Sequence, residues 1–404
     1  MIDNTSGCSS VMRARSKKIV WISSMVFDFC NVISQTQILN QLSKRGYDAF
    51  LFATRSRKNH QLTNIGFHLI LIPLRYVPVA SSSLYIFTLF ILLPFFVVST
   101  KPDYVVLEPG SSILGLMLKP FSRVLKFKMI LDVRSTPIKV RNTLRMNLHL
   151  LVFRSSVTLA KKKLDGITVL TKSMKKHMCF EFDIPLENVG VWTSGVALDL
   201  FNPENYDGKE MRRKFGLEDK FIIFYHGALG TARLEGIAET IKSLEILKSQ
   251  SDNLVLFLLG EGDALPTLRE LVRESHLENA VVIKGMVDYS DVPKYIAMCD
   301  VGIVPLPNSP NWRYQCPLKL LEYLAMGKFV IATDIPANRE VMGESKCGIY
   351  VSSVSPQAIA AAITHAYDNR KTLKKYRLIR RNIVEEKYSW MKVAEDLETY
   401  LSKI

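Results

Sequence analysis

The stretch CPLKLLEYLAMGKFVIATDIP (316–336) predicts a helix that leads directly into a buried strand. Pro317 suits the first turn of a helix, because its φ is already helical and it has no N–H to lose. The leucines recur at helical spacing and can face a core, while Lys319 and Glu322 are three residues apart and share another face. Since helix N-termini attract phosphate, the pattern favours a diphosphate site with a carboxylate placed to bind a ribose diol. An amphipathic helix with a solvated ion pair is the alternative interpretation.

Short apolar runs alternate with helix-like segments on both sides of this stretch. The runs are rich in Val, Ile, Leu and Phe without regular polar alternation, so they predict strands that are buried on both faces. We expect strands at 18–24, 48–54, 68–74, 103–109, 128–134, 166–171, 221–227, 254–260, 280–285, 301–306, 329–334 and 348–352. A polar junction at 189–217 divides them into two groups. The pattern predicts an α/β protein with two Rossmann-like, doubly wound domains facing a cleft.

The charge of the chain is concentrated in its first half. The 404 residues carry a formal net charge of +15, and residues 1–200 hold 26 Lys and Arg against 11 Asp and Glu, whereas the second half is neutral. Such an excess indicates an anionic partner, and a basic face kept for solubility is the alternative. We expect no nucleic-acid partner, because the basic residues are not interleaved with an aromatic stacking platform.

The most apolar segment, SLYIFTLFILLPFFVV (83–98), lies in the same half. No residue between Arg75 and Lys101 is charged, so its length makes it a candidate for crossing a membrane. A core helix and a helix that skims the membrane surface give the same signal. The basic residues that follow it are Lys119, Arg123, Lys126, Lys128, Arg134, Lys139, Arg141, Arg145, Arg154 and Lys161–Lys163. An apolar face beside basic residues is typical of peripheral binding to anionic lipid, which is the surface we expect as a partner.

Cysteine usage indicates a reducing compartment. The six cysteines include no CxxC pair, which predicts neither a disulfide framework nor a thiolate metal site, and they are Cys8, Cys30, Cys179, Cys299, Cys316 and Cys347. The first eighteen residues are polar, so we expect no signal peptide. The sequence contains no Asp-x-Asp pair, and we therefore expect no catalytic metal and no cofactor.

A second phosphate-binding pattern occurs in FYHGALGTARLEGI (224–237), where a strand ends at Gly227 and Arg233 stands at the entry to a helix. Glycine-rich turns between a strand and a helix let the backbone approach phosphate, and an arginine adds a permanent charge. A surface position for Arg233 is the alternative. The motifs LFLLGEGD (256–263), VVIKG (281–285) and DVGIVPL (300–306) follow in order.

In this order the motifs resemble the donor domain of glycosyltransferase family 4, retaining sugar transferases with the GT-B fold. The corresponding segments are Gly227–Leu229 with Arg233, Gly260–Gly262, Val282–Gly285, Asp300–Pro305 and Pro317–Val330. The segment GVWTSGVALDLFNP (190–203) resembles the linker of that family. The resemblance implies a Rossmann-like acceptor domain at 1–198, a nucleotide-sugar donor domain at 199–385, and a C-terminal helix at 386–404 that crosses back to the first domain.

The resemblance also implies roles for individual residues. Arg233 and Lys319 match the catalytic cations on the diphosphate, and Glu322 matches the glutamate that binds the donor ribose. The resemblance places further donor-binding positions in the loop at Gly227 and Ala228 and at the helix start, Pro317 and Leu318. The main chain of Lys284, Gly285 and Met286 corresponds to the segment that reads the base. Tyr314 is also a donor-binding position and replaces the first glutamate of the family's E-x7-E pattern. The family's histidine after the fifth strand is absent, and LDVRSTP (131–137) offers Asp132 instead as a catalytic candidate or a residue that caps the loop.

The expected activity is therefore retaining transfer of a sugar from a UDP- or GDP-linked donor to a glycan or lipid-linked acceptor. We expect the protein to be cytoplasmic and peripheral at the inner face of the membrane. Two alternatives share the architecture: a sugar-nucleotide epimerase, and a non-catalytic regulator that binds nucleotide-sugars.

Overall fold

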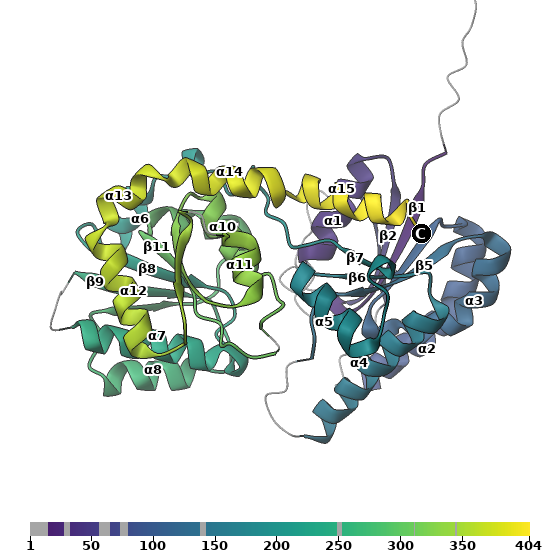
Figure 1. The fold of residues 1–404 in the computed structure, drawn as a ribbon, viewed down its shortest axis with the longest axis horizontal. Helices are drawn as coiled ribbons and strands as arrows, with labels where there is room; N and C mark the ends of the chain where they lie inside the picture. Colours follow the sequence, from purple (N-terminus) through teal and green to yellow (C-terminus); the bar gives the residue numbers. More distant parts are fainter. Residues whose placement is uncertain are drawn as a thin grey trace, which may run out of the picture.

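The computed structural model describes residues 15–27, 33–55, 65–72, 80–137, 143–248, 253–310, 312–343 and 346–404. Within these residues the chain forms two parallel β-sheets, each with helices on both faces (Figure 1). The predicted α/β class with two doubly wound sheets is confirmed. The N-terminal segment expected to be polar, together with Cys8 and Cys30, lies outside the described residues, whereas Cys179, Cys299, Cys316 and Cys347 are buried free thiols.

The first sheet has seven strands in the order β3-β2-β1-β4-β5-β6-β7. Its strands are β1 (Lys18–Phe27), β2 (Asp48–Arg55), β3 (His68–Ile72), β4 (Tyr104–Leu107), β5 (Lys128–Val133), β6 (Gly166–Val169) and β7 (Val189–Val191). Its helices are α1 (Ile33–Lys44), α2 (Ala80–Thr100), α3 (Leu114–Leu125), α4 (Leu144–Lys163) and α5 (Lys172–Phe182). Successive β1 side chains enter different cores: Ile19 and Trp21 pack with α1, whereas Val20 and Ile22 pack with α2 and α3. Both faces are buried, which explains the continuous apolar runs.

The second sheet has six strands in the order β10-β9-β8-β11-β12-β13. Its strands are β8 (Phe221–His226), β9 (Leu254–Leu259), β10 (Val281–Lys284), β11 (Val301–Val304), β12 (Phe329–Thr333) and β13 (Gly348–Val351). The remaining helices are α6 (Gly208–Phe215), α7 (Leu234–Leu247), α8 (Leu265–Glu274), α9 (Val292–Met298), α10 (Leu318–Ala325), α11 (Pro336–Met342), α12 (Pro356–Asp368), α13 (Arg370–Lys375), α14 (Arg377–Lys387) and α15 (Trp390–Leu401). The strand order reverses between β8 and β11, and ligands of such sheets bind at the carboxyl ends near this reversal.

The last two helices run from the second domain back onto the first (Figure 1). Helix α15 packs against α1 and β7, where its buried face joins the core of the first domain. Gly190 and Gly195 make this contact possible, because a Cβ at either position would lie within 2.6 Å of the Tyr400 or Trp390 ring. The C-terminal helix is therefore a structural bridge between the domains.

The two domains also touch directly. Thr171 Oγ1 donates to the carbonyl of Tyr314 at 2.8 Å, and Ser194 Oγ donates to the carbonyl of Cys316 at 3.0 Å. The segment that precedes α10 thus rests on the first domain, and the start of α10 lies next to the interdomain contact.

Candidate functional site

Two glycine loops interlock at the carboxyl ends of β8 and β9. Gly227 has φ +117°, and its N–H donates to the carbonyl of Leu259 at 2.9 Å. Gly260 has φ +148°, and a Cβ there would lie 1.9 Å from the carbonyl oxygen of Gly227. Leu229 N–H donates to the carbonyl of Glu261 at 2.8 Å. Both backbones are therefore fixed in a form that only glycine adopts without strain.

Asp263 anchors the same loop from the β9 side. Its carboxylate accepts hydrogen bonds from Thr231 N–H and Thr231 Oγ1, both at 2.8 Å. These bonds, the backbone one first, lower the pKa of Asp263 below its ordinary value. Thr231 begins a short 3-10 helix that ends at Arg233, immediately before α7. The loop anchored by Asp263 thus fixes the backbone that leads to Arg233.

Lys319 lies in the first turn of α10, and its ammonium group lies against the Gly227 loop. Its Nζ is 3.6 Å from the centre of the Tyr225 ring and 3.2 Å from the place of a Cβ on Gly227. The Nζ is buried and has no hydrogen-bond partner among the described residues. Burial, and secondly the charge of Arg233, lower the pKa of Lys319 well below its ordinary value, while Glu322 opposes the shift.

Arg233 supplies the second cation of this cluster. Its guanidinium lies 5.0 Å from the centre of the Trp312 ring. Burial raises the pKa of Tyr225 to about 12, and Arg233 acts in the opposite direction, so the arginine, the tyrosine and Lys319 share one electrostatic environment. Neither cation has an ion pair within the described part of the chain. Two cations without an ion pair beside a glycine loop are an arrangement that favours an anionic ligand.

Glu322 is almost completely buried one turn further along α10. Its Oε1 accepts a hydrogen bond from the Tyr289 hydroxyl at 2.7 Å. Its Oε2 lies 3.1 Å from His226 Nε2, at ion-pair distance but without hydrogen-bond geometry. A carboxylate has about four acceptor positions, so Glu322 retains capacity for ligand hydroxyls. Sequence reasoning missed Tyr289 and His226, although His226 directly precedes the predicted Gly227.

The start of α10 differs slightly from the prediction. Pro317 has φ −72° and ψ 125°, so it is the N-cap, and the helix begins at Leu318 rather than at the proline. The fixed φ of proline suits both positions, and the extended ψ places it outside the first turn. Leu318 is half-buried against the apolar core of the first domain. The helix that carries Lys319 and Glu322 is therefore positioned by both domains.

The expected base-reading segment lies beside the second glycine loop. Lys284 is the last residue of β10, and its carbonyl accepts a hydrogen bond from Gly260 N–H at 3.0 Å. Gly285 follows near Glu261, and the Met286 side chain is exposed. The loop residue Ala228 is exposed as well, and its carbonyl accepts a hydrogen bond from the Tyr225 hydroxyl at 3.2 Å. These backbone bonds tie both segments to the glycine loops.

Tyr314 takes part in the interdomain contact. Its ring stacks on His177 of α5, with centroids 4.6 Å apart and planes inclined by 12°. The carbonyl of Tyr314 is the acceptor for Thr171 described above. In this arrangement the side chain that replaces the family glutamate holds the first domain rather than pointing at Glu322.

Asp132 lies in the interior of the first domain, away from the donor-side cluster. Its Oδ1 accepts hydrogen bonds from Thr168 Oγ1 at 2.7 Å and from Trp192 Nε1 at 2.8 Å, and its side chain has no exposed surface. Burial raises the pKa of Asp132 to about 6, while the charge of Arg134 opposes the shift. Asp132 therefore touches no open surface from which it would reach a substrate.

Arg134, counted above among the basic residues near the apolar segment, is partly buried. Its guanidinium lies 3.5 Å above the Trp192 ring and donates to the Trp192 carbonyl at 2.6 Å. Burial lowers its pKa to about 10. Lys139 and Arg141 lie outside the described residues. Among the residues that the structure describes, no group of three or more His, Cys, Asp or Glu side chains is placed to hold a metal ion.

Comparison with known proteins supplies independent information on the chain. Residues 207–383 match the family model described as glycosyl transferases group 1. The alpha-D-kanosaminyltransferase of Streptomyces kanamyceticus is 22% identical over 213 residues, which are 52% of this chain and 53% of that protein. The GDP-mannose-dependent alpha-(1-6)-phosphatidylinositol monomannoside mannosyltransferase of Mycobacterium tuberculosis is 23% identical over 239 residues, or 59% and 61% of the two chains. The matches thus span between half and two thirds of these relatives.

The fold is shared more completely than the sequence. The structure of Anabaena Alr3699/HepE in complex with UDP and glucose has a TM-score of 0.72 and 14% identity, and covers 96% of this chain and 100% of that one. The two Rossmann-like sheets therefore have the GT-B arrangement. Taken together, the family match over the second domain, the glycosyltransferase relatives and the fold support a GT-B glycosyltransferase.

Proposed function

We propose that the protein is a retaining glycosyltransferase that moves a sugar from a UDP- or GDP-linked donor to a glycan or lipid-linked acceptor. The observation that carries the proposal is the buried ammonium of Lys319, which stands beside Gly227 and Arg233 without a counter-ion among the described residues. A buried cation without a partner is costly. A diphosphate removes that cost, because its oxygens supply the missing acceptors.

The donor is bound in two parts. Lys319 and Arg233 hold the diphosphate against the Gly227 loop, and Glu322 accepts hydrogen bonds from the ribose hydroxyls. The neighbouring backbone at Lys284–Met286 is available to contact the base. The Mycobacterium relative is named for its use of GDP-mannose and the Anabaena structure holds UDP and glucose, so both bases belong in the test.

The transfer step depends on stabilising the departing nucleotide diphosphate. Negative charge grows on its terminal phosphate as the bond to the sugar carbon breaks, and fixed cations at that place lower the barrier. Arg233 and Lys319 are already in position, so little reorganisation is needed. Since the sequence has no Asp-x-Asp pair and the two cations meet the charge, we expect a reaction that needs no divalent metal or cofactor.

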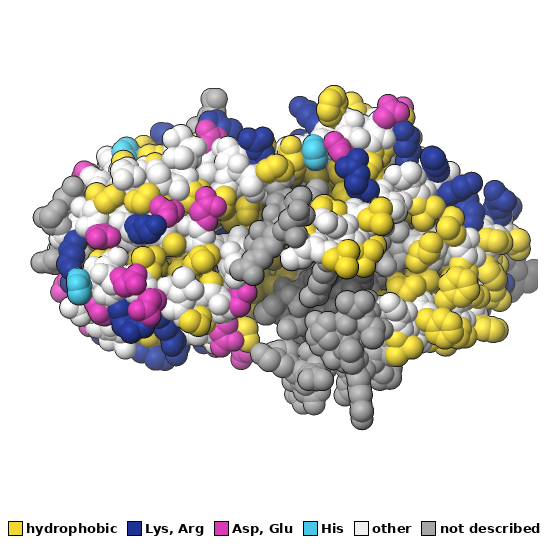
Figure 2. Space-filling view, turned by 90° about the horizontal axis from the view of Figure 1, so that it is seen from below, with side chains coloured by type: hydrophobic (Ala, Val, Ile, Leu, Met, Phe, Trp, Pro, Cys, Tyr) yellow, Lys and Arg dark blue, Asp and Glu magenta, His cyan; other side chains and the backbone are white. Residues whose placement is uncertain are grey.

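The acceptor side of the proposal rests on the first domain and its helix α2. One face of α2 packs inward through Tyr85, Leu89, Leu93 and Val97. The opposite face is exposed and equally apolar, with Leu84, Phe87, Phe90, Ile91, Phe95 and Val98 each about half exposed or more. Figure 2 shows hydrophobic side chains gathered on this domain with Lys and Arg nearby.

Helix α2 also meets the length and hydropathy expected of a membrane span over Ser83–Thr100, and only 22% of that window is buried. Its inner face is committed to the sheet, so we propose that α2 lies in the membrane surface with its outer face in lipid. Basic residues on the neighbouring elements that have no ion pair in the described structure are Arg123, Lys126, Lys128, Lys162 and Lys163. These support contact with an anionic surface, at the inner face of the cytoplasmic membrane.

A donor panel tests the function. Purified protein is incubated with UDP- and GDP-sugars and a membrane extract, with and without EDTA, and the release of nucleotide is compared with that by Glu322→Ala. We expect release from one class of donor, an inactive variant, and no effect of EDTA. The anomeric configuration of the isolated product, read by NMR, decides retention. Binding without transfer, or epimerisation of the donor without acceptor, contradicts the proposal.

A further inference from the structure

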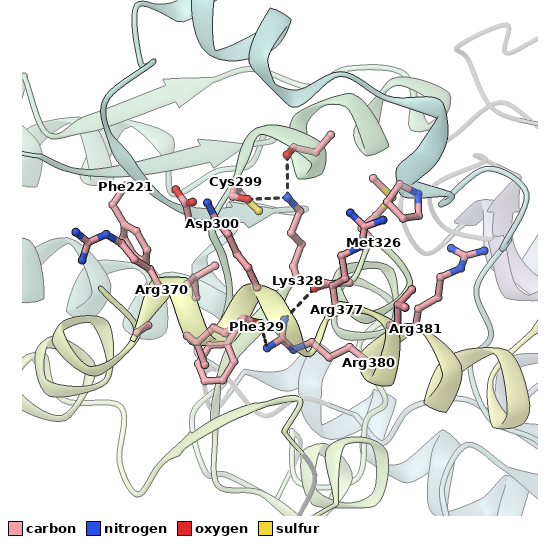
Figure 3. A pocket seen from close by; sticks show the side chains of 18 of the residues that line it. Phe221, Cys299, Asp300, Met326, Lys328, Phe329, Arg370, Arg377, Arg380 and Arg381 are labelled. Atoms are coloured by element: carbon pink, nitrogen blue, oxygen red, sulfur yellow. Dashed lines mark hydrogen bonds between the residues drawn. The ribbon is translucent and has the colours of Figure 1, made fainter. Parts of the chain in front are cut away.

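A cavity lies at the opposite edge of the second sheet from the glycine loops. Its volume is about 440 Å³, and its walls include the first residues of three strands, Phe221, Val301 and Phe329. Helices α13 and α14 form the other side (Figure 3). The glycine loops follow the last residues of the same sheet, so the two sites are separated by the length of the strands.

The walls of this cavity are strongly basic. Six cations line it, namely Lys328, Arg370, Lys374, Arg377, Arg380 and Arg381, against the single lining carboxylate of Asp300. Asp300 is already bonded to Arg212 at 2.6 Å. Seven of the twelve residues from 370 to 381 are Lys or Arg and none is acidic. The local charge is therefore positive, although the second half of the chain is neutral as a whole.

Two of the cations, Lys328, which is partly buried, and Arg380, which is buried, donate hydrogen bonds to backbone carbonyls. Lys328 Nζ donates to the carbonyls of Ala297 and Cys299 at 2.8 and 2.7 Å. Arg380 is 2% exposed and donates to the carbonyls of Lys346, Gly327 and Leu373. Burial lowers the pKa of both side chains. Carbonyl dipoles satisfy their hydrogen bonds but do not neutralise their charge.

Two further cations are exposed and carry no ion pair in the described structure. The Arg370 guanidinium donates to the Tyr367 carbonyl and lies 4.3 Å from the centre of the Tyr367 ring. Lys374 lies four residues further along the same face and lines the cavity mouth. By contrast, Arg377 is bonded to Glu204 and Arg381 to Glu385. Arg370 and Lys374 are thus the cations most available to a ligand.

We propose that this cavity binds a small phosphorylated metabolite at a site separate from the donor site. Arg370 and Lys374 would contact the phosphate, and Lys328 and Arg380 add positive charge to the walls of the same cavity. The volume is that of a typical small-molecule pocket, and Phe221, Phe329 and Leu373 provide apolar surface for the organic part of the ligand. The inference does not depend on which sugar is transferred.

Helix α10 connects this cavity to the donor side. Helix α14 holds the end of α10 and the turn after it, because Arg381 Nη1 donates to the carbonyl of Ala325, the last residue of α10, at 2.9 Å and Arg380 Nη1 donates to Gly327 O at 3.0 Å. The first turn of α10 carries Lys319, and α10 is about 12 Å long. A ligand that shifts Arg380 or Arg381 therefore also shifts α10, the helix that carries Lys319. The coupling must be reciprocal, since each ligand changes the affinity for the other by the same factor.

Calorimetry with the donor side disabled tests the site. Arg233→Ala/Lys319→Met protein is titrated with inorganic pyrophosphate and with glucose 6-phosphate at constant ionic strength. We expect binding that Arg370→Gln/Lys374→Gln weakens by roughly tenfold or more, since charge-assisted hydrogen bonds are lost. Lys371→Gln/Lys375→Gln is the matched control, because these neighbours are exposed and do not line the cavity.

The alternatives have distinct outcomes. Absence of binding to the donor-disabled protein, or equal loss in the cavity variant and its control, overturns the proposal. Vesicles that contain phosphatidic acid form the third arm. Because α2 is expected to bind such vesicles too, the readout is the difference between the variants. Vesicle binding that is weakened by Arg370→Gln/Lys374→Gln and not by the control, without binding of either small phosphate, assigns the cations to lipid and overturns the proposal as well. The thermal midpoints of all variants are compared first, so that a loss of folding is not read as a loss of binding.

Discussion

The Lys319 ammonium lies 3.6 Å from the centre of the Tyr225 ring, and its Nζ has no hydrogen-bond acceptor among the described residues. The face of an aromatic ring attracts a cation but supplies no hydrogen bonds. Arg233 adds repulsion. The folded protein therefore keeps a charge that its own groups satisfy only in part, and a bound anion completes the arrangement.

Replacing this lysine should move binding and stability in opposite directions. We expect Lys319→Met to weaken nucleoside diphosphate binding and to lower kcat by about 10²–10³, as for the loss of one fixed charge at a developing anion. The same change should raise the thermal midpoint, because a buried uncompensated charge is removed. Calorimetry and thermal unfolding measure the two effects. Lys214→Met, at an exposed lysine of α6 that is not among the proposed donor-binding positions, is the control. A variant that loses binding and stability together would show a structural role instead.

Nucleotide binding should take up a proton. The pKa of free Lys319 is well below its ordinary value, mainly because of burial, and a diphosphate beside it raises that pKa again. Above the lowered pKa the lysine is neutral in the free protein, so affinity should fall as the pH rises. Titrations between about pH 6 and pH 9 in buffers of different ionisation enthalpy measure the uptake. The uptake should disappear in Lys319→Met, and its persistence there would assign the proton to another group.

Glu322 should discriminate between ribose and sugars without the hydroxyl pair. It is held by Tyr289 and lies beside His226, so its carboxylate is oriented before the ligand arrives. We expect the parent protein to bind the ribonucleotide about tenfold or more tightly than its 2′,3′-dideoxy analogue. Glu322→Ala should bind both equally, whereas Tyr289→Phe should keep part of the preference. An undiminished preference in Glu322→Ala would place the ribose elsewhere.

The second domain was predicted closely from its residues because its signals are local. Strands expected at 221–227 and 254–260 are observed at Phe221–His226 and Leu254–Leu259. Parallel strands bring their carboxyl ends to one edge, so Gly227, Arg233 and Lys319 meet as the spacing implies. The hydrogen bond from Tyr289 to Glu322 and the approach of His226 to the same carboxylate join elements that are distant in sequence, so no local pattern predicts them.

The basic cavity escaped prediction for a different reason. The summed charge of residues 201–404 is zero, and that sum hides the cluster at 370–381. Its carboxylates lie on other elements, such as α7 and α8, so the balance is global and not local. The burial of Asp132 could not be predicted from the sequence either, because it depends on Trp192, which lies sixty residues further along the chain.

The exposed face of α2 should control membrane association. Phe87 and Phe95 are 63% and 73% exposed on that face. We expect Phe87→Ser/Phe95→Ser to lose flotation with anionic vesicles and to keep its thermal midpoint, since each ring contributes about 1.5–3 kcal/mol only when it is buried in lipid. Phe180→Ser is the matched control, because Phe180 is 89% exposed on α5 of the same domain. Equal flotation of all three proteins would exclude α2 as the contact.

Asp132 should make the stability of the first domain depend on pH. Its pKa is about 6 in the folded protein against 3.8 as the ordinary value, mainly because of burial. Since the unfolded chain loses the proton first, the free energy of unfolding should fall by about 3 kcal/mol as the pH rises from about 4 to 6. Asp132→Asn removes this pH dependence. Measured by urea unfolding, the free energy of unfolding of the variant should therefore rise relative to that of the parent between about pH 4 and pH 6. Asp263 should have the opposite effect on stability, because its pKa is lowered in the folded protein. Its contribution to the free energy of unfolding is lost as the pH falls, and Asp263→Asn removes that contribution. Parallel curves for Asp132→Asn and the parent would mean that the carboxyl group is ionised at the same pH in both states.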